Sequence, residues 1–290
     1  MTHQTYTALI TPFKNDKLDE TALEKIIEHQ IKNGVSGIVP CGTTGESPTL
    51  SHEEHNRITD LCVQIANKRI KIMAGTGSNS TSEAVMLTKE AKKAGVDSCL
   101  IVTPYYNKPT FAGIKEHYRA LNECGIDLTI YNIPGRSVIN ITDDQIADLA
   151  ENFQNVTGIK DATGDLARVA TMRKSINKDF SYLSGEDMTI VGFNAMGGNG
   201  IISVTANIAP KLVSDLINAT SSGDYQEALK IQDKLTNLHQ ALFSETNPIP
   251  IKYAASLLGL CTDEIRLPLT TPSDDVKSVI KREMQKLELI

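Results

Sequence analysis

The chain has 290 residues, of which 40% are hydrophobic and 22% charged, and its 29 basic and 35 acidic side chains give a net charge of −6. This composition is typical of a globular protein with one large α/β domain or two ordinary ones, and the acidic balance argues against a nucleic-acid binder. No apolar stretch approaches the length of a transmembrane helix, and the first ten residues lack the pattern of a secretory signal, so we expect a cytoplasmic protein without membrane contact.

Cysteine and glycine patterns exclude several kinds of site. The five cysteines are odd in number, form no CxxC pair and lie mostly in apolar runs, which is typical of reduced thiols in the cytosol. The glycine-rich stretches 75–80 and 196–200 match neither a dinucleotide-binding nor a phosphate-binding loop. The stretch HEEH at 52–55 lacks the HExxH spacing of a zinc protease, and we expect no metal.

Short β-rich runs alternate with amphipathic helical stretches through most of the chain. Helical patterns such as 22–34 and 81–95 end on a glycine that suits a helix C-terminus. Eight such β–α units in one chain predict a (β/α)8 TIM barrel, with a doubly wound open sheet as the alternative. The predicted strands are 6–13, 37–43, 71–77, 98–106, 128–134, 156–163, 181–187 and 200–207.

The pattern changes after residue 207, where four helical stretches follow one another with no strand between them. They cover about 208–220, 223–243, 248–258 and 275–288. The first would be the last barrel helix, and the others an appended C-terminal helical segment. We therefore expect a catalytic barrel over 1–222 and a helical segment over 223–290 that packs on the barrel or on another subunit.

Lysine 160 is the leading candidate for chemistry. Active sites of this fold lie at the carboxyl ends of the strands, and Lys160 lies near that end of the run 156–163, on the same face as Val156 and Gly158. Desolvation there favours the neutral amine that attacks a carbonyl, so Schiff-base chemistry is one interpretation. A structural lysine paired with Asp161 or with a glutamate is the other.

Other strand ends carry groups that could assist such a lysine. Tyr131 has the parity of residues that face the barrel mouth and could pass protons, with hydroxyls of Thr43 and Tyr106 as relays; a rim tyrosine without a chemical role is equally open. The glycine turn 42–46 leads toward a helix, and its backbone N–H groups and threonines form a natural carboxylate site. Arg136 could bind a second carboxylate, although a loop arginine is commonly only solvated.

Six separated motifs together resemble one family. The chain resembles the dihydrodipicolinate synthases (4-hydroxy-tetrahydrodipicolinate synthases), within the Schiff-base lyase superfamily of (β/α)8 barrels, over essentially its whole length. Several motifs in the family's order are far more specific than any one alone. They are GTTGES (42–47), VTPYYNKP (102–109), YNIPGR (131–136), GIKDATGD (158–165), LSGED (183–187) and GIISVTAN (200–207).

The resemblance implies a role for each site residue and no separate cofactor. Lys160 would form an imine with pyruvate, Tyr131 would donate and accept protons, and Thr43 would relay them to Tyr106 of a neighbouring subunit. The resulting enamine would attack L-aspartate 4-semialdehyde to give 4-hydroxy-tetrahydrodipicolinate, on the diaminopimelate route to lysine. The remaining substrate-binding residues implied are Thr44, Ile202 and Gly185 for pyruvate and Arg136 for the carboxylate of the semialdehyde.

Related activities remain as alternatives at this point. Sialic-acid lyases tend to have Ser-Thr in place of Thr43-Thr44 and no arginine at 136, whereas sugar-acid aldolases share the threonines. Arg136 is therefore the residue that best distinguishes a dihydrodipicolinate synthase from these related enzymes. A non-catalytic keto-acid or lysine binder would have no need of Lys160. One departure from the family is Ser137-Val138, where Thr-Gly is usual, which alters the loop beside Arg136.

The resemblance also implies regulation and assembly. In members that lysine inhibits, the inhibitor lies at a dimer interface, and Pro48 here replaces a smaller residue beside that site. A tyrosine shared across subunits requires a homo-oligomer, for which the family suggests a tetramer built as a dimer of dimers. The residues that match the inhibitor site are Ser47, His52, His55, Asn79, Glu83 and Tyr105.

Overall fold

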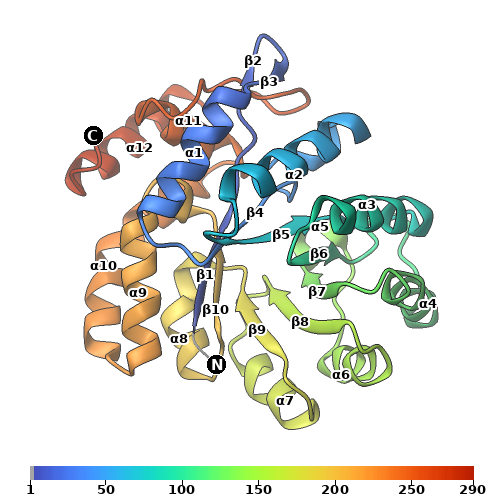
Figure 1. Ribbon diagram of the computed structural model, residues 1–290. Coiled ribbons are helices and arrows are strands. Elements are labelled where there is room, and N and C mark those ends of the chain that lie inside the picture. Colours follow the sequence, from blue (N-terminus) through green and yellow to red (C-terminus); the bar gives the residue numbers. More distant parts are fainter. Residues whose placement is uncertain (1–2) are drawn as a thin grey trace.

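A closed barrel of eight parallel strands forms the centre of the computed structural model, which describes residues 3–290 (Figure 1). In space β1 is followed by β10, β9, β8, β7, β6, β5 and β4, and β4 pairs with β1 to close the barrel. The closed order confirms the predicted TIM barrel and excludes the open sheet. The strands are β1 (Gln4–Ala8), β4 (Gly37–Val39), β5 (Lys71–Gly75), β6 (Ser98–Val102), β7 (Asp127–Asn132), β8 (Val156–Asp161), β9 (Ser181–Ser184) and β10 (Gly200–Ser203).

One helix follows each barrel strand and lies outside the barrel (Figure 1). Side-chain caps fix where several of these helices begin: Ser51 and Thr142 each form a capping box with the residue three positions later. Gly95 ends one helix in the left-handed conformation that glycine tolerates. The helices are α1 (Glu20–Lys32), α2 (His52–Ala66), α3 (Thr81–Ala94), α4 (Phe111–Asn122), α6 (Asp143–Asn152), α7 (Ala167–Ser175), α8 (Ile190–Ala195) and α9 (Pro210–Ser222).

Three further helices extend the chain beyond the barrel, as predicted. They are α10 (Tyr225–Leu242), α11 (Ile249–Leu257) and α12 (Asp274–Lys286). Helix α10 packs against α9, and α12 packs against α10 and α11, so the segment stacks on one side of the barrel (Figure 1). Within residues 3–290, none of the helices combines the length and apolar character needed to span a membrane.

All eight predicted strands extend past the carboxyl ends of the observed strands, two of them for reasons that the structure makes plain, and one small sheet was missed. The run 6–13 ends as a barrel strand at Ala8, and Phe13–Lys14 (β2) pairs instead with Lys17–Leu18 (β3) in a hairpin. The run 98–106 ends at Val102. Pro104 lacks the N–H that a central strand requires, and Tyr106 adopts a left-handed φ of 72°. Four short helical turns lie between the main elements, and two of them, η1 and α5, carry site residues. They are η1 (Ser47–Thr49), α5 (Pro134–Ser137), η2 (Asp187–Thr189) and η3 (Thr205–Asn207).

Candidate active site

Lys160 and Tyr131 lie side by side near the carboxyl ends of two neighbouring strands. They are partners in the register of β7 and β8, which places both side chains on the same face of the sheet. Only 7% of Lys160 and 5% of Tyr131 is exposed. The Nζ atom of Lys160 lies 4.2 Å from the centre of the Tyr131 ring, within the range of a cation–π contact. The structure thus brings the candidate nucleophile to the candidate proton carrier.

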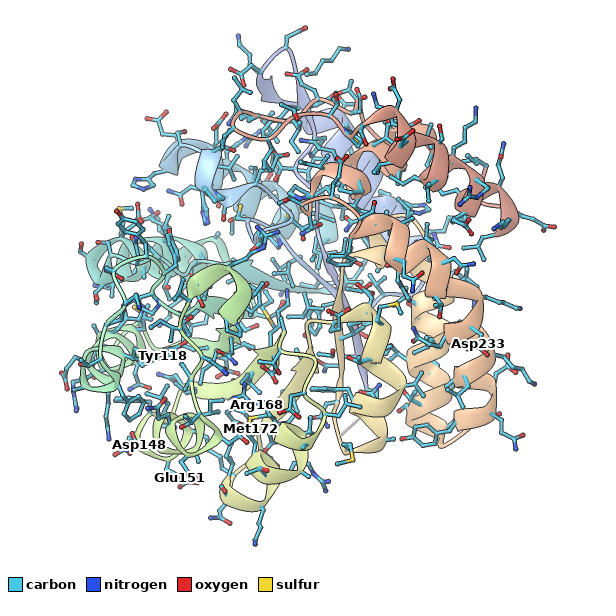
Figure 2. The ribbon with its side chains drawn as sticks, turned by 180° about the vertical axis from the view of Figure 1, so that it is seen from behind. Tyr118, Asp148, Glu151, Arg168, Met172 and Asp233 are labelled. Atoms are coloured by element: carbon cyan, nitrogen blue, oxygen red, sulfur yellow. The ribbon has the colours of Figure 1, made fainter. Side chains whose placement is uncertain are left out.

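Asp161 points away from Lys160 into a separate buried network. Its Oδ1 accepts from Asn132 Nδ2 at 3.1 Å and lies 3.4 Å from Nη1 of Arg168, which is on the buried side of α7 (Figure 2). Burial raises the pKa of Asp161, and the Arg168 charge opposes that rise. No ion pair joins Lys160 to any carboxylate of residues 3–290, so the alternative of a paired structural lysine does not fit.

Gly185 lies against Lys160, and Ile202 is buried two strands away. A Cβ atom on Gly185 would lie 3.0 Å from Cε of Lys160 and 2.8 Å from Cβ of Ala162. The Gly185 N–H donates to the backbone oxygen of Asp161 at 2.7 Å, which holds the chain in this close position. Glycine is therefore required for the approach of this loop to Lys160. Ile202 is buried on β10, which pairs with β9, the strand that precedes Gly185.

The turn after β4 carries Thr43 and Thr44 at the same end of the barrel. Its own backbone groups close it: the N–H of Gly45 donates to Gly42 O at 3.1 Å and that of Glu46 to Thr43 O at 3.1 Å. The amides of Thr43 and Thr44 make no hydrogen bond within residues 3–290, so they remain available to an anion. The turn leads first into the short helical turn η1, and the N-terminus of α2 follows only at His52.

Arg136 and Thr44 meet through a residue that the sequence did not single out. Arg136 is exposed on α5, and its Nη2 donates to the backbone oxygen of Asn247 at 2.8 Å. The Nδ2 of Asn247 donates to Thr44 Oγ1 at 3.0 Å, and its buried Oδ1 has no partner in the described chain. Asn247 opens the stretch NPIP, where an Asn-Pro pair between two helical patterns was the available signal.

Tyr106 does not join the other candidates within one chain. It is 89% exposed on the loop after β6, and no hydrogen bond connects it to Thr43 in the described chain. The two residues after Arg136, which differ from the usual Thr-Gly of the family, also differ from each other in exposure. Ser137 is buried and its Oγ donates to Ile133 O at 3.0 Å, whereas Val138 is exposed in a left-handed conformation.

A cavity of about 420 Å³ extends from the turn toward α2 and α3. Thr43 and Arg136 line it, together with five of the six residues matched to an inhibitor site: Ser47, His52, His55, Glu83 and Tyr105. Asn79 is not part of the lining; its backbone oxygen accepts from Asn107 Nδ2 at 2.9 Å. The structure therefore gathers most of this second predicted site beside the first.

Some polar groups that line this cavity have hydrogen-bond partners within the protein, and others do not. Glu83 Oε1 lies 2.7 Å from His52 Nε2, and Ser78, which the sequence did not indicate, donates its hydroxyl to Oε2. These bonds hold the pKa of Glu83 below its usual value. His55 Nε2 donates to Gly75 O at 2.8 Å, which leaves its buried Nδ1 as an acceptor without a partner in the described chain. Burial lowers the pKa of His55.

Known proteins match this chain over nearly its whole length. The model of the dihydrodipicolinate synthetase family matches residues 1–287. The 4-hydroxy-tetrahydrodipicolinate synthase of Parvibaculum lavamentivorans is 53% identical over 286 residues, which cover 98% of each chain. The chain belongs to the dihydrodipicolinate synthetase family. This membership confirms the family and the lyase class that the six motifs predict.

Two solved structures place this family member among close structural neighbours. The chloride-inhibited dihydrodipicolinate synthase of Acinetobacter baumannii, complexed with pyruvate, has a TM-score of 0.97 and 42% identity, with 100% of each chain covered. The enzyme of Cyanidioschyzon merolae with lysine bound has a TM-score of 0.96 and 36% identity, with 99% of each chain covered. Within residues 3–290, no group of three or more His, Cys, Asp or Glu side chains is arranged around a metal site.

Proposed function

We propose that this protein condenses pyruvate with L-aspartate 4-semialdehyde, through a Schiff base on Lys160, to give 4-hydroxy-tetrahydrodipicolinate. The observation that carries the proposal is the placement of Lys160, a buried amine without a carboxylate partner that faces the ring of Tyr131. Such an amine can add to a carbonyl and form a covalent intermediate. The synthase name of the relative from P. lavamentivorans and the pyruvate bound to that from A. baumannii support it.

In the first half of the reaction, the proposed nucleophile is Lys160 Nζ. It adds to C2 of pyruvate, the carbonyl oxygen leaves as water, and a C=N bond forms. Tyr131 donates the proton that this oxygen needs and recovers one afterwards. Thr43, with Tyr106 of a second copy, passes protons between Tyr131 and solvent. With the imine nitrogen protonated, loss of a proton from the methyl carbon then gives the enamine.

In the second half, the enamine carbon attacks the aldehyde carbon of the semialdehyde. A C–C bond forms, and the aldehyde oxygen takes a proton to become the hydroxyl of the product. The α-amino group of the semialdehyde then replaces Lys160 on C2, which closes the six-membered ring and restores the lysine. The covalent bond to Lys160 makes a separate cofactor unnecessary in this scheme.

Two carboxylate sites are proposed to orient the substrates. The amides of Thr43 and Thr44, the Thr44 hydroxyl and the backbone at Ile202 would hold the pyruvate carboxylate beside Lys160. Gly185 leaves the space that this approach requires. Arg136, whose Nη2 is oriented by Asn247 O, would bind the carboxylate of the semialdehyde.

The aldehyde that the protein accepts as a substrate distinguishes the proposed synthase from a related keto-acid lyase. We expect turnover of pyruvate with L-aspartate 4-semialdehyde and not with N-acetylmannosamine or glyceraldehyde. Arg136→Gln should lower kcat/KM for the semialdehyde about 10- to 100-fold, because a charge-assisted bidentate contact is lost. Arg57→Gln is the control, since Arg57 on α2 forms an exposed ion pair with Glu20 on α1. Preference for either sugar aldehyde would instead identify a sugar-acid lyase, and failure to turn over any aldehyde would favour a binding protein.

We also propose that L-lysine inhibits the protein by binding in the cavity beside the active site. The carboxylate of Glu83 suits an ammonium group, and His55 Nδ1 is a buried acceptor without a partner in the described chain. The cavity also reaches Thr43 and Arg136, so a ligand there would adjoin the catalytic turn. The lysine bound to the relative from C. merolae supports this proposal.

Loss of the Glu83 charge should weaken this inhibition. In Glu83→Gln, the lysine concentration for half inhibition should rise about tenfold or more, because the amide keeps the shape of the side chain but not its charge. The measurement is a dose–response series in the assay above. Glu90→Gln, on the same helix in an exposed pair with Lys93, should leave the inhibition unchanged. A wild-type protein that is fully active in millimolar lysine would contradict the proposal.

A homo-oligomer is proposed because the site lacks Tyr106 within one chain. The exposed Tyr106, beside exposed Tyr105, would enter the site of a second copy, as part of a tetramer built from two dimers. Sedimentation at micromolar concentration tests this assembly. A cytoplasmic location is also proposed, since all five cysteines are unpaired, as in a reducing compartment.

A further inference from the structure

A buried ion pair joins the catalytic turn to the C-terminal helices. Lys252, on α11, donates to Oε1 of Glu46, and both side chains are 1% exposed. The other oxygen of Glu46, Oε2, accepts the backbone N–H of Arg266 at 3.0 Å. The fully buried ring of Phe13 lies against both cations, 4.2 Å from Lys252 Nζ and 4.1 Å from Arg266 Cζ. The C-terminal segment thus provides the partners for both carboxylate oxygens of Glu46.

Glu46 ends the turn that carries Thr43 and Thr44, and its backbone is strained. Its φ is 57°, and Cys41, the residue just before the turn, has a φ of 55°. Residues with a Cβ rarely hold such left-handed conformations unless their surroundings fix them. The Glu46 N–H bonds the oxygen of Thr43, so the anchored end of the turn is tied directly to a candidate catalytic residue. Asn247, five residues before Lys252, adds its hydrogen bond to Thr44.

We propose that Lys252 is a positioning residue for the pyruvate site. Through Glu46 it holds turn 42–46 so that the unbonded amides and the hydroxyls of Thr43 and Thr44 face the substrate carboxylate. Lys252 acts indirectly, because it is buried between Glu46 and the Phe13 ring. Neutralising one partner of a buried pair leaves the other charge uncompensated. A displacement of about 1 Å in a binding group can lower a rate about 100-fold.

Steady-state kinetics of Lys252→Met test this inference, which rests on the proposed function. Methionine keeps the length of the side chain and removes the charge. We expect kcat/KM for pyruvate to fall about tenfold or more, while kcat/KM for the semialdehyde changes about twofold or less. A covalent intermediate separates the two half-reactions. The kcat/KM for pyruvate therefore reports on the first half-reaction, and the kcat/KM for the semialdehyde on the second. The double variant Lys252→Met/Glu46→Gln, which leaves no buried charge in the pair, should show the same pattern and replaces the single variant if that does not fold.

Thermal unfolding of each variant and one control separate positioning from stability. Arg57→Gln breaks an exposed ion pair between α2 and α1 and should leave both kcat/KM values unchanged. If a folded Lys252→Met or double variant keeps the wild-type kcat/KM for pyruvate, the positioning role is overturned and only a contribution to stability remains. If the wild-type protein forms no pyruvate adduct on borohydride reduction, the proposed function itself fails, and this role with it.

Discussion

Lys160→Ala is expected to lower kcat by a factor on the order of 10⁴ or more, because it removes the atom that forms the covalent bond to pyruvate. The variant should still fold, since Lys160 makes no ion pair whose partner would be left buried and uncompensated. The decisive measurement is mass spectrometry after incubation with pyruvate and borohydride. A pyruvate-derived mass should appear on the peptide that contains residue 160 in the wild-type protein and be absent from the variant.

Two other lysines serve as controls for this result. Lys211→Ala, which removes an exposed lysine on α9, should form the adduct as the wild type does. The buried Lys252 is the more demanding comparison, because a hydrophobic environment alone could make a lysine reactive. Its contact with Glu46 commits its ammonium group to a carboxylate, so no adduct is expected there. An adduct on any lysine other than Lys160, or none at all in the wild type, would contradict the catalytic assignment.

Tyr131→Phe is expected to lower kcat about 10²- to 10⁴-fold, the range in which a positioned acid or base contributes. Phenylalanine keeps the ring that faces Lys160 Nζ and removes only the hydroxyl, so the packing around the amine is preserved. The adduct with pyruvate should therefore still form on Lys160, but more slowly. Stopped-time borohydride trapping, together with steady-state turnover, measures both effects on the same variant.

Tyr182→Phe provides the matched control for this variant. Tyr182 is also buried in a barrel strand, where its ring packs edge-to-face against Phe180 at 5.2 Å between centroids. Loss of the Tyr182 hydroxyl should leave the rate at which the pyruvate adduct is trapped on Lys160 unchanged. A Tyr131→Phe variant that traps and turns over pyruvate at the wild-type rate would show that Tyr131 has only a packing role.

Local patterns in the sequence predicted the barrel and indicated which side chains could face its mouth. Eight alternating β–α units specify a closed parallel barrel because each strand must be buried between neighbours and covered by a helix. The two-residue repeat of a strand also indicated that Lys160 and Tyr131 could face the mouth. These predictions follow from periods of a few residues, which a single sequence displays directly, whereas the register of β7 and β8 that sets the two side chains beside each other is a property of the folded barrel.

Only the tertiary structure decided what surrounds and fixes that pair. Asn247 reaches Thr44, and Lys252 and Arg266 reach Glu46, across more than 200 positions of the chain. No local period records such contacts, because they depend on how the helices after the barrel return to its mouth. The ends of strands at Ala8 and Val102 were likewise set by turns rather than by apolar content. The exposure of Tyr106 is also a property of the fold, although the family resemblance had already implied that this side chain serves a neighbouring subunit.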